Sequence, residues 1–149
     1  MNLSGKRVLV VGLARSGMAA IRVLKKLGAV ITLSESKKKE EIKELDFLNE
    51  NGVEIVGQDA EVFERDFDLV VKNPGVPFRS PAMQRLAERN IPVITEIELA
   101  YQVAKPQHYI AVTGTNGKTT TTTLVYEILK RAFPGKAHLC GNIGIPLCE

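Results

Sequence analysis

The sequence has few cysteines, little net charge and no long apolar run. Only Cys140 and Cys148 occur, which is too few for a disulfide framework or a complete metal site, so free thiols in the cytoplasm are expected. The net charge of +3 is too small to indicate a nucleic-acid partner. No apolar stretch approaches the roughly 20 residues that span a bilayer, and residues 1–7 contain no cleavage-type segment, so no membrane association is expected.

The remaining composition is that of an ordinary globular protein. Of the 149 residues, 44% are hydrophobic and 25% are charged. A chain of this size is expected to form one domain or two small ones and to bury roughly 68–70% of its unfolded surface. The best boundary is Lys105-Pro106-Gln107, which divides the chain into residues 1–105 and residues 106–149.

Strand-like and helical patterns alternate through residues 1–105. The apolar runs over residues 7–12 and 29–33 predict strands buried on both faces, and the apolar spacing over residues 18–27 predicts a helix between them. Further strands are predicted over residues 53–56, 67–71 and 91–94, and further helices over 36–51, from Ser80-Pro81 onward, and over 96–104. The predicted fold class is α/β, with a Rossmann-like parallel sheet.

The turn after the first strand almost matches a dinucleotide fingerprint. Residues 12–17 read Gly-Leu-Ala-Arg-Ser-Gly, with Ala14 in place of the middle glycine of G-x-G-x-x-G, and Glu35 follows the second strand where an acid would bind ribose. The missing glycine is the one that lets a pyrophosphate approach closely. The turn therefore favours another nucleotide or a nucleotide-sugar, with a dinucleotide or tight packing without a ligand as alternatives.

A second glycine-rich turn begins at Gly114. The run Tyr109 to Val112 predicts a buried strand, residues 118–132 predict a helix, and residues 137–140 look like a last strand. A strand, a glycine-rich turn and a helix form the geometry that cradles phosphate, with Lys118 supplying positive charge and Thr119 a hydroxyl for Mg²⁺. The strict P-loop would have glycine at position 112, so this loop is a variant; an ordinary βα turn is the alternative.

Residues 106–149 are thus expected to form the βαβ start of a P-loop ATPase domain. A unit of this size cannot cover both faces of its own sheet, so the chain is expected to stop inside its second domain. An uncovered sheet edge there would allow self-association.

The two turns together resemble those of the Mur ligases. The resemblance rests on Thr113-Gly114-Thr115-Asn116-Gly117-Lys118-Thr119-Thr120 and on Gly141-Asn142-Ile143-Gly144 downstream. Residues 12–17 and Asn73-Pro74-Gly75 resemble the members that join D-glutamate to UDP-N-acetylmuramoyl-L-alanine. The loop of this family departs from the strict P-loop at the position of Val112.

The resemblance implies a cytoplasmic, ATP- and Mg²⁺-dependent amide ligase of peptidoglycan precursor synthesis, and hence of cell wall biogenesis, cell shape and cell division. The reaction would pass through an acyl phosphate, with Lys118 and Thr119 catalytic and Thr119 on the metal. The implied ATP-binding residues are Gly114, Thr115, Asn116, Gly117, Lys118, Thr119 and Thr120. The implied UDP-substrate residues are Arg15, Ser16, Glu35, Ser36, Lys37, Asn73, Gly75 and Asn142.

Many relatives carry aspartate, threonine and arginine at the positions of Glu35, Ser36 and Lys37, and a lysine cannot make the planar bidentate contact of an arginine. The remaining metal ligands and the D-glutamate site are expected after Glu149, so the 149-residue chain is predicted to bind UDP-substrate at most and to be inactive. Two alternatives remain: a nicotinamide-dinucleotide-binding oxidoreductase and a non-catalytic UDP-sugar-binding module.

Overall fold

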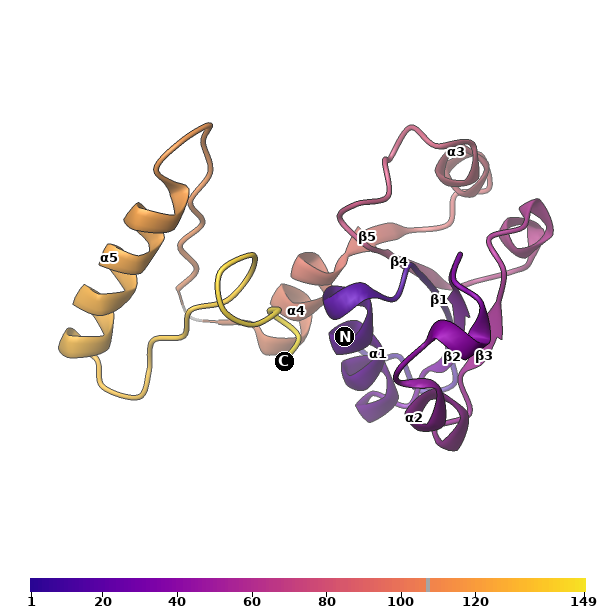
Figure 1. The fold of residues 1–149 in the computed structure, drawn as a ribbon, viewed down its shortest axis with the longest axis horizontal. Coiled ribbons are helices and arrows are strands. Elements are labelled where there is room, and N and C mark those ends of the chain that lie inside the picture. The colour runs from indigo at the N-terminus through magenta and orange to yellow at the C-terminus, as the bar shows by residue number, and fades with distance from the viewer. Residues whose placement is uncertain (107) are drawn as a thin grey trace.

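The computed structural model describes residues 1–106 and 108–149; Gln107, the last residue of the predicted boundary, lies outside the described residues. Five parallel strands form one sheet in the order β3-β2-β1-β4-β5 (Figure 1). The strands are β1 Arg7–Val11, β2 Val30–Ser34, β3 Glu54–Val56, β4 Leu69–Lys72 and β5 Val93–Thr95. This sheet confirms the predicted α/β class.

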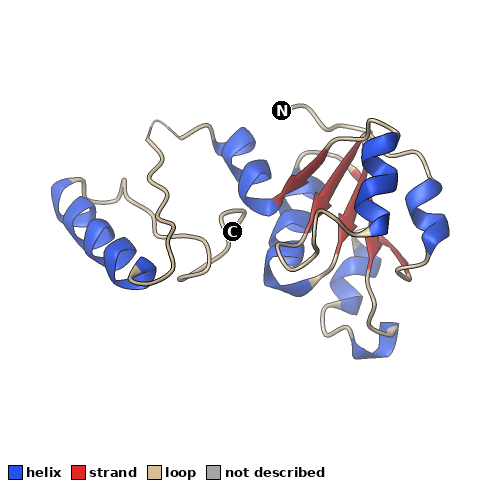
Figure 2. Ribbon diagram, turned by 90° about the horizontal axis from the view of Figure 1, so that it is seen from above, coloured by secondary structure: helices blue, strands red, loops and turns tan. Residues whose placement is uncertain are grey.

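Both faces of the sheet are covered, because successive side chains of a strand point to opposite faces. In β1, Val8 and Val10 belong to one core cluster, while Leu9 and Val11 belong to the other. The first cluster includes side chains of α1, α2 and α4, and the second those of η2 and α3. Helices accordingly lie on both sides of the sheet (Figure 2). These elements are α1 Ala14–Lys26, α2 Leu45–Glu50, α3 Pro81–Glu88, α4 Glu96–Ala104 and the 3₁₀ segment η2 Ala60–Glu64.

The predicted start of α3 is confirmed. The Ser80 hydroxyl accepts a hydrogen bond from the Met83 amide at 3.4 Å, and Pro81 is the first helical residue. Such a cap satisfies an amide that the helix itself leaves free. In the described part of the chain, no helix combines the length and the apolar character needed to cross a membrane.

The helix predicted over residues 36–51 is wrong as a continuous element. The segment forms a short 3₁₀ turn, η1 Lys39–Glu41, then an extended residue at Ile42, and α2 follows. A helix starting at residue 36 would place three consecutive lysines, residues 37–39, at its positive end, where cations are unfavourable. Ile42 and Leu48 are nevertheless buried, as expected for the core stripe.

Residues 108–149 contain the predicted helix but not the predicted strands. α5 covers Lys118–Ala132, while residues 109–112 form no strand, and Tyr109 and Ile110 are 46% and 59% exposed. Within the described residues the only sheet ends at β5, so these backbone groups have no strand to pair with and stay outside regular secondary structure. Residues 137–140 contribute a single bridge, between Cys140 and Ile145.

α5 stands apart from the sheet and buries none of its residues (Figure 1). Leu124 and Ile128 on this helix are 59% and 66% exposed. The packed core of the protein is therefore confined to the unit formed by β1 to β5 and the helices around that sheet.

Candidate functional site

In the turn between β1 and α1, the backbone of Gly17 lies unusually close to that of Gly12. Gly12 has φ +84°, and a Cβ atom added to Gly17 would lie 2.2 Å from the Gly12 carbonyl oxygen. Only glycine therefore fits at position 17. α1 starts without a side-chain cap and without an acid in its first turn. Its positive end, with Arg15 and Ser16, thus lies at the carboxyl edge of the sheet and suits an anion.

Glu35 holds this turn from the neighbouring strand. Glu35 is 8% exposed, and its carboxylate accepts hydrogen bonds from the amides of Leu13 at 2.6 Å, Ser36 at 2.8 Å and Lys37 at 3.1 Å. The Ser36 hydroxyl donates to it as well, at 3.1 Å. Burial raises the pKa of Glu35, but these hydrogen bonds outweigh burial and hold the pKa below its usual value. The structure thus brings Glu35, Ser36 and Lys37 together with the first glycine-rich turn.

Asn73 joins the same turn from β4. Its side-chain amide donates to the Ser16 hydroxyl at 2.9 Å, and its side-chain oxygen accepts from the Gly75 amide at 2.9 Å. Its backbone amide donates to the Val11 carbonyl at 2.9 Å. Ser16, Asn73 and Gly75 therefore meet where β1 and β4 end. This is where the sheet order reverses direction, which is the usual ligand position in open α/β sheets.

A cavity of about 430 Å³ opens beside α1, with Arg15 and Lys37 among its lining residues. Two further basic side chains, Arg22 and Lys43, also line it, and neither is among the predicted site residues. Arg22 lies seven residues after Arg15 and so on the same helix face, which is a signal that the sequence contained. Three acids, Glu41, Glu44 and Glu149, line the cavity as well, so its charge is mixed.

The segment with Asn142 contacts the unit formed by β1 to β5 and its covering helices. The Arg15 guanidinium donates to the Gly144 carbonyl at 3.1 Å, and the Glu96 carboxylate accepts from the Cys148 amide at 2.5 Å. Glu96, the first residue of α4, is only 3% exposed, whereas Asn142 is exposed. Arg15 and Glu96 thus hold the segment containing Asn142 against the unit that holds the other predicted UDP-substrate residues.

Both cysteines are free, as predicted. Burial raises the pKa of the Cys148 thiol to about 12, and the negative charge of Glu96 adds to this effect. Burial likewise raises the pKa of Cys140. Both thiols are therefore protonated at neutral pH and are weak nucleophiles.

Replacing Glu96 with alanine should release the C-terminal segment. The variant loses a hydrogen bond from the Cys148 amide to a charged acceptor, which is typically worth about 1.5–3 kcal/mol. Amides of residues 141–148 should therefore exchange with solvent about tenfold faster or more. Hydrogen exchange read by mass spectrometry measures this. Glu98→Ala, an exposed acid in the same helical turn, is the matched control. Unchanged exchange in residues 141–148 of Glu96→Ala would show that Glu96 does not hold the segment.

The second glycine-rich turn is open. Gly117, in the left-handed region with φ +74°, is the N-cap of α5, and no atom lies within 4 Å of a Cβ added there. The Lys118 ammonium donates to the Gly114 carbonyl at 2.6 Å and to the Thr115 carbonyl at 3.1 Å. Asn116, Thr119 and Thr120 are exposed. A free helix start, a lysine and exposed hydroxyls fit a phosphate group and its metal ion.

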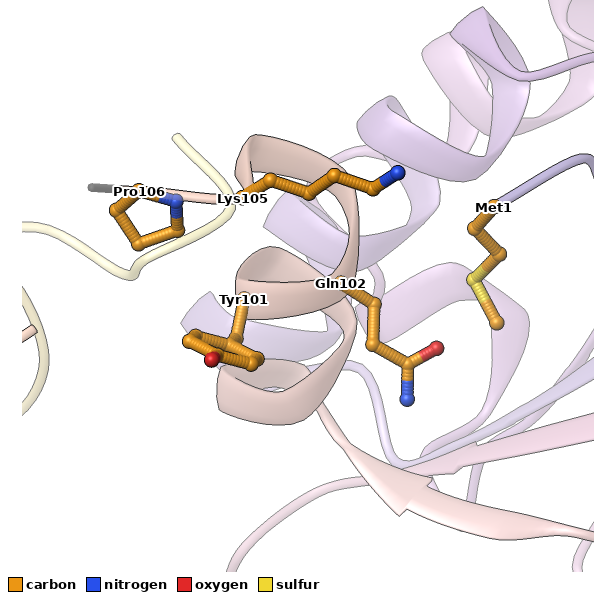
Figure 3. Close-up of a pocket in the computed structure, with 5 residues that line it drawn as sticks. All are labelled: Met1, Tyr101, Gln102, Lys105 and Pro106. Carbon is orange, nitrogen blue, oxygen red and sulfur yellow. The ribbon is translucent and has the colours of Figure 1, made fainter. Parts of the chain in front are cut away.

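A further cavity, of about 410 Å³, lies at the end of α4 beside the predicted domain boundary. Figure 3 shows Tyr101, Gln102, Lys105 and Pro106 around it, with Met1 opposite them. None of the residues that line it is a predicted site residue. This cavity is therefore separate from the candidate site at the carboxyl ends of β1 and β4.

Comparison with known proteins assigns the family. Residues 6–95 match the pattern of the Mur ligase MurD-like N-terminal domain, and residues 112–146 match that of the Mur ligase middle domain. The chain therefore belongs to the Mur ligase family. Within that family, its first domain is of the MurD-like kind.

Curated relatives agree with this assignment. The UDP-N-acetylmuramoylalanine--D-glutamate ligase of Geobacillus sp. (strain WCH70) is 47% identical over 97% of this chain and 32% of its own length. The ligase of the same name from Lactococcus lactis subsp. lactis (strain IL1403) is 48% identical over the same shares. The chain thus spans about one third of the length of these relatives.

Solved Mur ligases share the fold. A murein peptide ligase from Psychrobacter arcticus 273-4 superimposes with a TM-score of 0.60 at 25% identity, over 86% of this chain and 27% of that one. The UDP-N-acetylmuramate-alanine ligase MurC from Thermotoga maritima gives 0.53 at 27% identity, over 85% and 30%.

Proposed function

We propose that this chain provides the nucleotide-substrate site of an ATP-dependent amide ligase that joins D-glutamate to UDP-N-acetylmuramoyl-L-alanine in the cytoplasm. The observation that carries the proposal is the hydrogen bond between Asn73 and Ser16, the residue next to Arg15, at the sheet edge of a MurD-like domain. The reaction itself is proposed for a protein of the length of its relatives. For residues 1–149 we propose the binding step.

In this proposal the first unit, residues 1–105, binds the UDP end of the substrate. Arg15, Ser16 and the free amides at the start of α1 bind the diphosphate, because cations and helix starts both attract anions. Glu35 shapes the uridine side by fixing the amides of Leu13 and Lys37, and Ser36 and Lys37 supply the outer contacts. Asn73 and Gly75 line the same pocket, and Asn142 reaches the substrate from the second unit.

The second unit, residues 106–149, is proposed to hold the phosphates of ATP. Amides and hydroxyls of residues 114–120 would bind the phosphate oxygens, and Thr119 would hold Mg²⁺. Lys118 would exchange the carbonyls of Gly114 and Thr115 for phosphate oxygen and so oppose the charge that develops during phosphoryl transfer. Bound ATP supplies the phosphoryl group that activates the substrate carboxylate.

Calorimetry tests the nucleotide-substrate proposal. Titration of the chain with UDP-N-acetylmuramoyl-L-alanine should give saturable heat, and titration with NADH should give none. Arg15→Met should weaken the UDP-ligand about tenfold or more, since a hydrogen bond between charged groups is worth about 1.5–3 kcal/mol. Arg131→Met, an exposed arginine near the end of α5, is the matched control and should bind as the unchanged chain does.

Two outcomes contradict the proposal. A folded chain that gives no heat with the UDP-ligand has no such site. Heat with NADH would instead support the dinucleotide alternative that residues 12–17 and Glu35 left open.

A further inference from the structure

Lys72 is a buried lysine at the carboxyl end of a central strand. It is the last residue of β4, is paired in register with Val11 of β1 and Thr95 of β5, and is 3% exposed. The other residues of β4 are apolar and belong to the core. In the described part of the chain, no ion pair includes the Lys72 ammonium. Burial lowers its pKa, as expected for a cation taken out of water.

The ammonium is satisfied by the turn that follows it. It donates to the Val76 carbonyl at 2.7 Å and to the Asn73 carbonyl at 3.3 Å, and it lies 4.1 Å from the centre of the Phe78 ring. These three contacts all come from the six residues after Lys72. Hydrogen bonds from a charged donor are strong and directional, and apolar packing is not directional. The Lys72 ammonium therefore fixes the positions of the two carbonyls and of the aromatic ring relative to one another.

The turn so fixed is the one that presents Asn73. The Val76 amide donates to the Asn73 carbonyl at 3.0 Å, so the carbonyl that accepts from Lys72 also closes the turn. The side chain of Asn73 then reaches the Ser16 hydroxyl and the Gly75 amide. A Cβ added to Gly12 would lie 3.2 Å from the Asn73 Cβ, so the two turns pack with little room for Asn73 to shift.

We propose that Lys72 is a positioning residue of the nucleotide-substrate site. Its ammonium binds the carbonyls of Asn73 and Val76 and so fixes the conformation of the turn. In this turn the Asn73 side chain is held in the position from which it orients the Ser16 hydroxyl toward the ligand. The inference rests on the proposed function, because it assigns Lys72 a role in that same site. A lysine that only stabilised the strand would leave ligand affinity unchanged in a folded variant.

A double-mutant cycle separates the two roles. Lys72→Met keeps the length of the side chain but removes its donors, and Asn73→Ala removes the group on which Lys72 is proposed to act. Each variant should bind UDP-N-acetylmuramoyl-L-alanine about tenfold more weakly in calorimetry. The double variant should bind no more weakly than Asn73→Ala alone, because Lys72 acts through Asn73. Lys26→Met, an exposed lysine at the end of α1, is the control and should leave the affinity unchanged.

Nuclear magnetic resonance of the unchanged chain gives a second, independent reading. The side-chain amide protons of Asn73 should exchange with solvent more slowly than those of Asn49, which is exposed. In Lys72→Met that protection should be lost. This measurement needs no ligand, and its first part needs no variant, so it applies even where Lys72→Met does not fold.

The outcomes distinguish this inference from the proposed function. Unchanged affinity in folded Lys72→Met, or losses that add fully in the double variant, would overturn the role of Lys72 while the proposed site stands. Fast exchange of the Asn73 side chain in the unchanged chain would overturn it as well. An unchanged chain that does not bind the UDP-ligand would instead overturn the proposed function, whatever Asn73 shows.

Discussion

Replacing Gly17 with alanine should lower the free energy of unfolding by about 3 kcal/mol or more, the upper range for overpacking a tight site. The added Cβ would lie 2.2 Å from the Gly12 carbonyl oxygen and 3.1 Å from its carbon. Both are backbone atoms of Gly12, which directly follows β1, so they can move only if α1 shifts away from the end of that strand. Urea unfolding followed by circular dichroism measures the loss.

A glycine elsewhere separates this clash from ordinary backbone strain. Gly52 has φ +64°, and no atom lies within 4 Å of a Cβ added there. Gly52→Ala should therefore cost only the strain of a left-handed alanine, about 1–2 kcal/mol. If Gly17→Ala proved no less stable than Gly52→Ala, the close packing of the β1–α1 turn would be refuted.

Glu35→Ala should destabilise the fold by about 2–4 kcal/mol at neutral pH. The substitution removes a buried charged acceptor and leaves the Leu13 amide without its partner, and either loss alone costs about 1–3 kcal/mol. Because the folded state lowers the pKa of Glu35, this stabilisation is fully present above the ordinary glutamate pKa. It is lost as the pH falls through the lower folded pKa.

The pH dependence of this stability difference tests the charge of Glu35 directly. Urea midpoints of the unchanged chain and of Glu35→Ala should differ at neutral pH and converge in acid. Glu88→Ala, an exposed acid on α3, is the control and should stay within about 0.5 kcal/mol of the unchanged chain. A constant difference between Glu35→Ala and the unchanged chain at all pH values would mean that the charge of Glu35 does not matter.

The sheet was predictable because its strands are buried on both sides. Residues 8–11 are all apolar, and residues 29–33 are apolar except for Thr32, as is typical of strands that are covered on both faces. The cap at Ser80 was predictable for a local reason, since a hydroxyl followed by proline satisfies a helix start whatever surrounds it. The spacing of residues 12–17 and Glu35 was enough to single them out, and the hydrogen bond from Leu13 to Glu35 joins them in the fold, while their role in binding stays a prediction.

Other features depend on contacts that spacing does not encode. The run Tyr109 to Val112 has the composition of a strand, but a strand needs a partner, and the described residues offer none beside it. Lys72 follows directly after an apolar run, and from sequence a lysine in that place is expected to lie exposed beyond the end of the strand. Its burial follows from the carbonyls of Asn73 and Val76, which only the folded turn places around it. The hydrogen bond from Asn73 to Ser16 joins residues 57 positions apart.

The confinement of the core to one end of the sequence bears on how the protein is made. The buried members of both core clusters all lie between Leu3 and Leu99. These residues leave the ribosome before α5 does, and domains generally fold as units during synthesis. The sheet and its covering helices can thus assemble while residues 114–132 are still being translated, and the nascent chain need not wait for later segments to shield its apolar surface.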